Sequence, residues 1–450
     1  MADVIIYIVG VFSKIPNATL SLKYQVCGVI VIVFSAVVII MMVIRLKRKP
    51  LIVIPYLCAI VLLIGSSAFM GIYATPAKGT LTYDINAGKI TIENIEMINI
   101  NITAKATTTI YVGAVLGYSE NGSDSILGNC KADNVTINVT TEKDAYVGTI
   151  SGKCIADISG ISGSGNISVN TNKEAYVGGL IGCTSVESTI NNAVFEGNIK
   201  VTSKIDSSTS ISDIFVGGLF GYVNRLTINN ANVSSNITVD CINTGDVAVG
   251  GLIGYSSAAS VTDGIKVNKA SVVGNITIEN ANNVIAAGLV TSSGKVTDAS
   301  YKGEVKIYAT DEVDFVGISN GNSVEKSYVN STILIETAGY ISSIGITSNR
   351  AKNCYFNGTM ELKSDYKVFA SGILGEGDYA INCYSTGNIN IIAGYKYTYS
   401  VVATGIALGY NSAPDIQNCF TDLCIVAKNS NSDSYIIGRV SHRCDEFIIY

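Results

Sequence analysis

The residue types needed for most hydrolytic and metal chemistry are scarce in this chain. It contains one histidine, His442, among 450 residues. A Ser/His/Asp or Cys/His catalytic set, or a histidine-rich metal site, would have to use that residue near the C-terminus. This scarcity disfavours enzymes that act through an activated nucleophile, and we expect neither a metal nor an organic cofactor.

Carboxylates are the remaining candidates for chemistry. One acidic set recurs at the same place in consecutive copies of a repeated segment: Asp144, Glu174, Asp213 and Asp246. Like charges on neighbouring strands repel unless they are solvated or bridged by a cation, and we expect an exposed turn edge. A Ca²⁺ ladder is the alternative, although the glycine-aspartate nonapeptide of calcium-binding β-rolls is absent. Paired acids can also cleave glycosides without histidine, but no convergent cluster of acids, arginine and lysine is visible.

The chain has 11 cysteines but no CxxC spacing, which disfavours a zinc or redox site. Several cysteines share one column of the repeat with small residues, which predicts a tight inward position. The column comprises Cys130, Ala193, Ala231, Ala270, Ala299, Ser327, Cys354, Cys383 and Cys419. In an oxidising compartment, the candidate disulfides are Cys154 with Cys183 and Cys424 with Cys444.

An aromatic column follows this small-residue column by one position. It comprises Tyr328, Tyr355, Tyr384 and Phe420. Alternation along a strand places it opposite the inward cysteines, so we expect it to face outward. Its rings would form either a platform for sugar rings or a ladder that stabilises stacked coils.

These residues must be positioned by a repeated architecture. An apolar-Gly-Gly-Leu-apolar-Gly block stands clearly at Ala175 to Gly182, Phe215 to Tyr222 and Val247 to Tyr255, with degraded copies before and after. Alternation of period two and strand-sized pieces between Gly/Asn/Ser turns predict an all-β fold, a parallel β-solenoid of about eleven coils over residues 75–450. A β-propeller is the structural alternative, but the turn dipeptides of its hairpins are scarce.

Both faces of the glycine-block strand are apolar. The face that carries Tyr111, Tyr146, Tyr176 and Phe215 is expected to lie in the core. The opposite face forms an apolar strip of Val177, Gly179, Ile181, Val216, Gly218, Phe220, Val249, Gly251 and Ile253. A strand with one face in water should alternate with polar residues, so we expect the strip to be covered by a chain segment or by a partner such as another copy.

The glycine blocks resemble the Glug motif, which is named for its Gly-Leu-apolar-Gly core. The resemblance is good at Gly178 to Gly182, Gly217 to Gly221 and Gly250 to Gly254, and it extends loosely over residues 85–440. It implies a secreted or anchored surface protein, as in adhesin-like and immunoglobulin-protease-associated chains. The motif carries no agreed activity of its own.

Two uncharged runs near the N-terminus are long enough to span a bilayer. Residues 26–44 and 51–74 flank a basic loop, residues 45–50, and follow a tail of residues 1–25. The loop's Lys and Arg residues place it in the cytoplasm. We therefore expect a two-helix transmembrane hairpin in the plasma membrane or cell envelope, with the N-terminus and the solenoid outside. A cleavable signal peptide or a buried hairpin fits these runs less well.

Asparagine sequons are numerous and would be glycan sites in a eukaryotic secretory setting. They are Asn17, Asn101, Asn121, Asn134, Asn138, Asn166, Asn232, Asn236, Asn275, Asn330 and Asn357. The alternative is structural, because Asn134, Asn166, Asn236 and Asn275 share one turn position where asparagine stacks well.

The composition excludes further classes of protein. A net charge of −5 argues against nucleic-acid binding, and 48% hydrophobic with only 14% charged residues excludes a disordered chain. We expect a membrane-anchored surface solenoid with a structural, adhesive or assembly role, which binds partner proteins, another copy of itself or glycans through its outer faces. The alternative is a membrane-tethered carbohydrate-active enzyme, a polysaccharide lyase or hydrolase on a β-helix. A carboxylate cluster away from the coil edges would favour that alternative.

Overall fold

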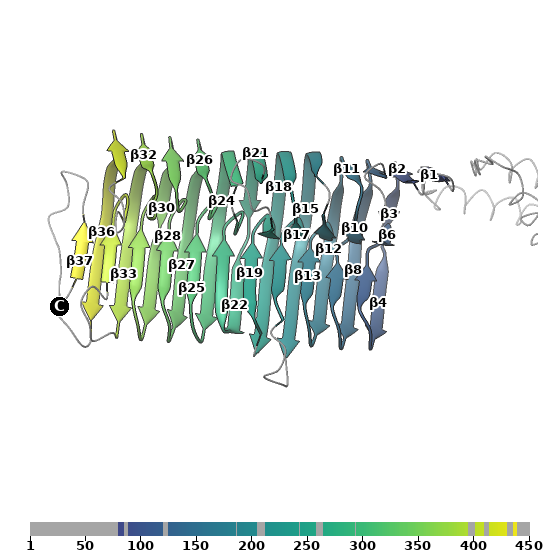
Figure 1. The fold of residues 1–450 in the computed structure, drawn as a ribbon, viewed down its shortest axis with the longest axis horizontal. Helices are drawn as coiled ribbons and strands as arrows, with labels where there is room; N and C mark the ends of the chain where they lie inside the picture. Colours follow the sequence, from purple (N-terminus) through teal and green to yellow (C-terminus); the bar gives the residue numbers. More distant parts are fainter. Residues whose placement is uncertain are drawn as a thin grey trace, which may run out of the picture. The chain divides into compact units, whose positions relative to one another are not determined.

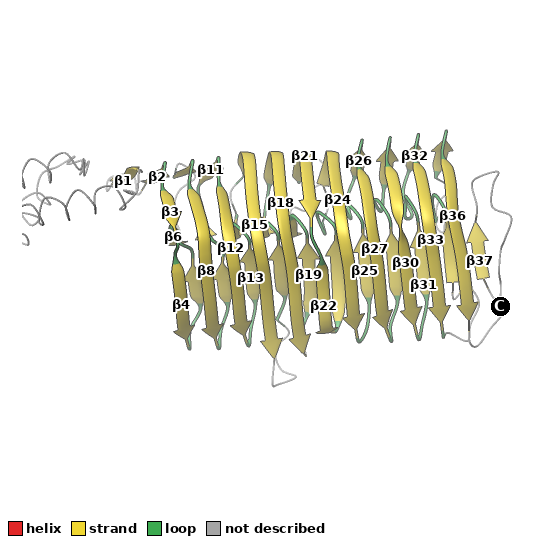
Figure 2. Ribbon diagram, turned by 180° about the vertical axis from the view of Figure 1, so that it is seen from behind, coloured by secondary structure: helices red, strands yellow, loops and turns green. Residues whose placement is uncertain are grey.

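The computed structural model describes residues 80–84, 89–119, 125–185, 187–204, 212–242, 244–257, 264–292, 294–394, 401–408, 414–429 and 435–438. These residues form an all-β structure with long parallel sheets, in agreement with the predicted solenoid class (Figures 1 and 2). In Figure 1 the colour changes steadily along the stack, because each coil packs on the coil before it in the sequence. The solenoid unit begins at Tyr83.

The strands belong to four sheets, here called A to D. Sheet A contains β1 (Thr80–Asp84), β2 (Lys89–Glu93), β7 (Ile126–Gly128) and β11 (Asp157–Ser159). Sheet B contains the longest strands of the solenoid together with several short ones: β3 (Glu96–Ile98), β4 (Asn101–Ala106), β8 (Lys131–Thr141), β12 (Ser162–Thr171), β15 (Ser188–Lys204), β18 (Leu226–Ile242), β21 (Ile265–Val273), β22 (Ile276–Ala281), β24 (Gly294–Ala309), β26 (Ser323–Glu325), β27 (Tyr328–Thr337), β29 (Arg350–Lys352), β30 (Tyr355–Ser364), β32 (Tyr379–Ile381), β33 (Tyr384–Ala393), β35 (Asp415–Gln417) and β36 (Phe420–Asn429).

The glycine blocks form the other two sheets. Sheet C contains β5 (Ile110–Val112), β9 (Ala145–Val147), β13 (Ala175–Gly178), β16 (Ile214–Gly217), β19 (Asp246–Gly250), β23 (Asn283–Ala287), β25 (Val313–Val316), β28 (Ile341–Ile344), β31 (Val368–Ser371), β34 (Val401–Thr404) and β37 (Tyr435–Gly438). Sheet D contains β6 (Leu116–Tyr118), β10 (Ser151–Cys154), β14 (Ile181–Thr184), β17 (Phe220–Val223) and β20 (Ile253–Ser256). The 11 strands of sheet C match the predicted number of coils.

One corner of each coil depends on a residue in the left-handed backbone region. Asn192 divides β15 into two legs at a φ of 59°, and Asn353 and Asn382 hold equivalent corners at 54° and 53°. Asparagine tolerates this conformation better than most residues with a side chain. Each of these corner residues stands directly before the small-residue column, so it sets the direction in which that column points.

The small-residue column lies inside the solenoid, as predicted. Cys130, Cys354 and Cys383 are each at most 2% exposed and belong to one continuous apolar core. Their thiols donate to backbone carbonyl oxygens, as from Cys354 Sγ to the oxygen of Lys352 at 3.3 Å. These cysteines therefore act as small core residues.

Sheet D packs closely on sheet C because of the first glycine of each block. A Cβ on Gly178 would lie 2.0 Å from the carbonyl oxygen of Ile181, and one on Gly217 would lie 2.0 Å from that of Phe220. After Gly250 the register places Ala287 at this position. Sheet D ends at β20, and the described residues of the later coils form isolated bridges there in place of strands. A side chain in place of this glycine is incompatible with such close packing.

The predicted membrane hairpin, residues 26–44 and 51–74 with the loop 45–50, lies outside the described residues. Within the described part of the chain, the structure contains no helix with the length and apolar character to cross a bilayer.

Candidate functional site

The predicted aromatic column belongs to sheet B and lies on the outside of the solenoid. We call it the sheet B column, and it comprises Tyr328, Tyr355, Tyr384 and Phe420. Tyr328 and Phe420 are 52% and 40% exposed, while Tyr355 and Tyr384 are half-buried. Tyr355 and Tyr384 stack with ring centroids 5.2 Å apart and planes 5° apart, and Tyr384 stacks on Phe420 at 5.1 Å. The outward prediction is therefore confirmed, and the sheet B column presents consecutive aromatic rings to solvent.

A second set of stacked rings lies where sheets C and D meet, and we call it the C–D aromatic tract. Ring centroids are 4.8 Å apart for Tyr111 and Tyr146, and 4.4 Å apart for Tyr146 and Tyr176. The tract comprises Tyr111, Tyr118, Tyr146, Tyr176, Phe215, Tyr222 and Tyr255. We expected the sheet C members to be core residues. This was wrong for Tyr111, Tyr146 and Tyr176, whereas Phe215 is buried. Tyr146 and Tyr176 are half-buried, whereas the alternating Val147 and Val177 are fully buried in the core.

Charged groups border the C–D aromatic tract. The Lys153 ammonium lies 5.6 Å from the ring centroid of Tyr118 and 5.5 Å from that of Tyr146. The Tyr176 hydroxyl donates to Glu174 Oε2 at 2.5 Å. Burial raises the pKa of both Tyr146 and Tyr176, and the bond to Glu174 raises that of Tyr176 further. The rings of the tract therefore stay uncharged near neutral pH, while Lys153 and Glu174 place charged groups at its edges.

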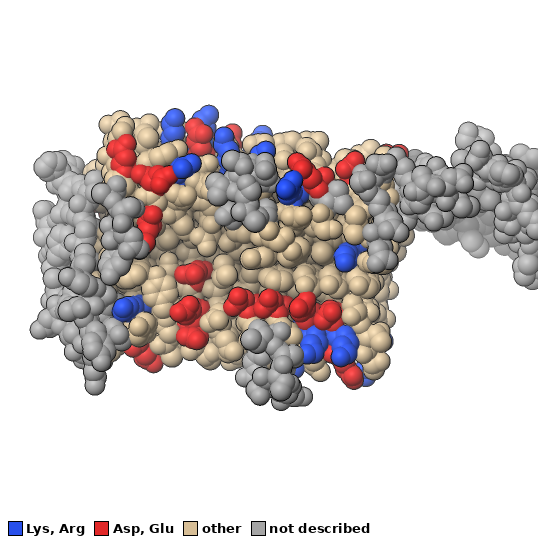
Figure 3. All heavy atoms as spheres, viewed as in Figure 1, with Lys and Arg blue, Asp and Glu red and all other residues tan. Residues whose placement is uncertain are grey.

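The acidic set lies at the start of paired strands of sheet C, so it forms a row across consecutive coils. Figure 3 shows a row of Asp and Glu side chains across this face of the solenoid. Its members are half-buried at Asp144, Glu174 and Asp213 and exposed at Asp246. The backbone N–H of Asp246 donates to Asp213 Oδ1 at 3.0 Å, and Asn283 Nδ2 donates to Asp246 Oδ1 at 3.3 Å. Hydrogen bonds between coils thus hold Asp213 and Asp246 where the chain enters sheet C. Among the described residues, no group of three or more His, Cys, Asp or Glu side chains could hold a metal ion.

The apolar strip is not a partner surface. Val177, Val216 and Val249 are 0% exposed and lie in the continuous core, and the other side chains of the strip are equally buried: Ile181, Phe220 and Ile253. The opposite sheet of the same chain covers the strip. A Cβ on Gly179 would meet the Phe195 ring, while on Gly218 and Gly251 it would meet the sheet B valines Val233 and Val272. Of the two expected coverings, a chain segment or a partner, the structure shows a segment of the same chain.

The predicted disulfide between Cys154 and Cys183 is not formed, because the two residues are one position out of register. Cys183 pairs with Lys153, and Cys154 pairs with Thr184. Successive side chains of a strand point to opposite faces, so the two thiols face apart, and both are free. Burial raises the pKa of Cys154 to about 12 and that of Cys183 to about 11. Cys424 is exposed, and its predicted partner Cys444 lies outside the described residues.

The described sequon asparagines lie on the surface. All are exposed except the half-buried Asn357: Asn101, Asn134, Asn138, Asn166, Asn232, Asn236, Asn275 and Asn330. Asn17 and Asn121 fall outside the described residues. The surface position is compatible with glycans and leaves glycosylation a proposal.

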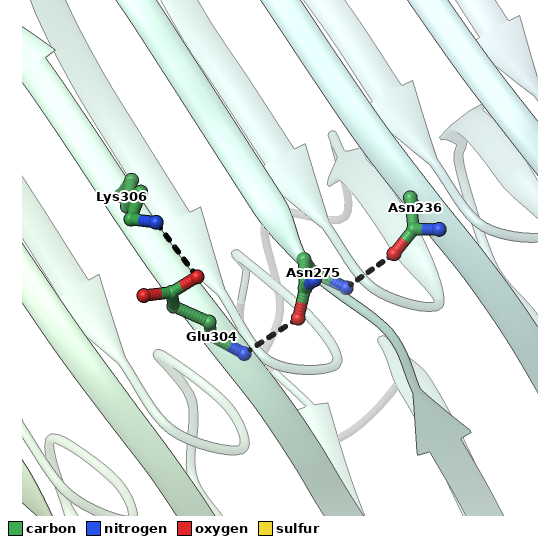
Figure 4. Close-up of polar contacts among 4 residues, drawn as sticks. All are labelled: Asn236, Asn275, Glu304 and Lys306. Carbon is green, nitrogen blue, oxygen red and sulfur yellow. Dashed lines mark hydrogen bonds and ion pairs between the residues drawn. The ribbon is translucent and has the colours of Figure 1, made fainter.

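Some of these asparagines form a hydrogen-bonded ladder (Figure 4). Asn236 Nδ2 donates to Asn198 Oδ1 at 3.1 Å. On the next coil, the backbone N–H of Asn275 donates to Asn236 Oδ1 at 3.1 Å. The ladder continues as the Glu304 N–H donates to Asn275 Oδ1 at 2.9 Å, and Lys306 pairs with the Glu304 carboxylate at 2.8 Å.

Asn134 does not share the ladder position, contrary to expectation. Thr136, two residues after it, pairs with Asn166, and Asn134 itself adopts a φ of 52° and donates to Asn99. A bulge in β8 therefore displaces it from the ladder.

A groove in the later coils was missed by sequence reasoning. It has a volume of about 590 Å³ and lies over sheet C where sheet D is absent. Tyr340 and Phe369 line it with ring centroids 5.4 Å apart at 83°, together with Asn349 and Glu376. The signal that could have revealed it is the loss of the first block glycine, from Ala287 onward.

Acidic groups lie close to this groove. Asp314 and Glu376 both contribute to a raised pKa of the Tyr340 hydroxyl, for which burial is the largest cause. Partial desolvation and the nearby Glu312 carboxylate raise the pKa of Asp314 to about 6, although the residue as a whole stays exposed. The groove therefore combines aromatic, amide and carboxyl groups.

No protein-family model, no curated protein and no solved structure matches this chain.

Proposed function

We propose that this chain is a membrane-anchored cell-surface β-solenoid, related to Glug-motif proteins, that binds glycans or partner proteins through its outer faces. Its role is adhesion, assembly or surface structure. The anchor is the hairpin at 26–74, with the loop 45–50 in the cytoplasm and the solenoid outside. Tagging both termini and treating intact cells with protease tests this placement, since loss of the C-terminal tag supports it and full protection overturns it.

The observation that supports binding is the exposed sheet B column. Tyr355, Tyr384 and Phe420 present stacked rings at spacings of 5.1–5.2 Å on consecutive coils. The negative faces and large apolar area of aromatic rings suit the C–H faces of sugars or the apolar anchors of a protein partner. The competing interpretation is a ladder that stabilises the stack alone.

A glycan array probed with detergent-solubilised full-length protein separates these two interpretations. The double variant Tyr355→Ala/Tyr384→Ala should lose binding, while Tyr308→Ala, an exposed tyrosine of the same sheet outside the column, should retain it. Binding that survives the double variant would remove the column from the function. If the double variant is less stable than the wild type and the wild type binds no glycan, the column acts only as a ladder that stabilises the stack.

A carbohydrate-active enzyme is the second candidate function. The observation that favours it is that Glu376 lines the groove and that Asp314 pairs in register with the groove residue Ser342. The Asp314 pKa of about 6 suits proton donation near neutral pH. Incubation with polysaccharides and detection of new reducing ends tests it. Cleavage by the wild type that is lost in both Asp314→Asn and Glu376→Gln would support this candidate, and intact substrates would dismiss it.

A further inference from the structure

The groove in the later coils follows from a change in one column of the solenoid. From Gly113 to Gly250 the column is glycine, and the carbonyl groups of the following turn and strand occupy the space that a Cβ would need. Register pairs Ala287 with Val316 and Val316 with Ile344, so side chains fill this column afterwards. These three side chains form a small cluster separate from the main core. They occupy the face on which sheet D packs in earlier coils, and the space beside them is the groove.

Three successive coils build the two sides of this groove. Tyr340, directly before β28, and Phe369 of β31 provide an aromatic wall on consecutive coils. The turns that follow each sheet C strand provide the polar wall, which includes Asn322, Asn349 and Glu376. Ser348 Oγ donates to Asn320 Oδ1 at 2.5 Å, which ties two of these turns together. The polar groups are thus held by the stacked coils on which they stand.

The chemistry of the walls selects a class of ligand. Aromatic rings next to amides and a carboxylate match the alternating C–H faces and hydroxyl groups of a sugar. None of the described residues that line the groove is Lys or Arg, and Glu376 adds negative charge, so phosphate and uronate groups are disfavoured. A volume of about 590 Å³ falls within the roughly 300–1,000 Å³ of small-ligand sites. A protein partner would need about 800 Å² of surface on each side.

We infer that this groove binds a short neutral oligosaccharide, seated against Tyr340 and Phe369 and hydrogen-bonded to the amides and the carboxylate of the opposite wall. This inference rests on the proposed glycan-binding function and names a site for it that is separate from the sheet B column.

Saturation-transfer NMR and calorimetry on the detergent-solubilised full chain test the inference. The probes are the neutral trisaccharides maltotriose, cellotriose and triacetylchitotriose, with trigalacturonate as the anionic control. We expect at least one neutral probe to bind and the anionic probe to bind at least about tenfold more weakly. Phe369→Ala should weaken the neutral probe by about tenfold or more. Ser342→Phe adds a ring to the groove floor without removing a core residue and should block binding.

A matched variant distinguishes failure of the groove from failure of the proposed function. Tyr308→Ala removes an exposed sheet B ring that lies outside both the groove and the sheet B column, and it should leave groove binding unchanged. Tyr384→Ala removes a ring from the sheet B column and reports any binding that the column contributes by itself. Binding that survives both Phe369→Ala and Ser342→Phe but is lost in Tyr384→Ala would overturn the groove and retain the function. No binding of any neutral probe would overturn the groove and leave the proposed function to rest on other glycans or on protein partners.

Discussion

Tyr146 and Tyr176 stack with ring centroids 4.4 Å apart and planes within 2° of each other, although 30 positions separate them in the sequence. They belong to adjacent coils, where register pairs Tyr146 with Tyr176 directly. The stacking is therefore a property of the coil repeat, and it continues on the other side to Tyr111 at 4.8 Å.

Removing the Tyr146 ring should destabilise the solenoid. Tyr146→Ala loses contacts with both neighbouring rings, and we expect a decrease of about 1–3 kcal/mol in the free energy of unfolding, measured by urea denaturation. Tyr146→Phe keeps the rings stacked and should cost less than about 1 kcal/mol. An equal decrease for both variants would assign the effect to the hydroxyl instead.

A side chain on the first block glycine should force sheets C and D apart. In Gly217→Ala the new Cβ would lie 2.0 Å from the Phe220 carbonyl oxygen, and we expect a loss of about 1–3 kcal/mol. Gly117→Ala is the matched control, because its nearest atom, the Tyr111 carbonyl oxygen, is 3.2 Å away. Chemical denaturation followed by circular dichroism compares them. Unchanged stability of Gly217→Ala would contradict this account of sheet D.

The asparagine ladder should contribute to stability independently of glycosylation. Asn236→Ala removes one hydrogen bond donated to Asn198 and one accepted from Asn275, which predicts a loss of about 1–2 kcal/mol in urea denaturation. Asn232→Ala, in the same strand and also a sequon, should change stability by less than about 0.5 kcal/mol. If the two variants behave alike, the ladder is not the cause.

Asp314 should make stability depend on pH. Its folded pKa of about 6 exceeds the ordinary 3.8 because of desolvation and the Glu312 carboxylate. The folded state therefore binds the Asp314 proton more tightly than the unfolded state does. The resulting contribution to the free energy of unfolding is complete below about pH 4 and is lost as the pH rises through 6. Asp314→Asn should raise the Tm at pH 7.5 and change it little at pH 4.

Glu312→Gln provides the companion measurement for Asp314. Removing the like charge should stabilise the protein at pH 7.5 in the same direction but by less. A Tm difference between wild type and Asp314→Asn that is equal at both pH values would show that Asp314 does not titrate as described.

The cysteine thiols should differ in their rates of alkylation. Burial raises the pKa of Cys154 and Cys241 to about 12, so few thiolates form near neutral pH, whereas Cys424 is exposed. Among the cysteines that the structure describes, mass spectrometry after brief alkylation of the native protein should find Cys424 modified first, with Cys154 modified only in denaturant. Equal labelling in the native state, or a disulfide-linked Cys154–Cys183 peptide, would contradict the structure.

Local pattern was sufficient to predict the class of fold and the inner column. Small residues recurring one position before Tyr355 and Tyr384 indicate a tight inward site, and Cys354 and Cys383 are indeed buried. Strand alternation then places the tyrosines outside, because adjacent side chains of a strand point to opposite faces. These conclusions need only residues close together in the sequence.

The tertiary structure alone decided what depends on register and on packing between sheets. In the glycine-block strands both faces are apolar, so alternation groups Val147 apart from Tyr146 but cannot say which of them points inward. Register decides that Cys154 and Cys183 face apart, since a shift of one residue exchanges the faces. The groove beside Phe369 arises because a distant column changes from glycine to larger residues, and only the stacked coils bring that change into contact with the turns above it.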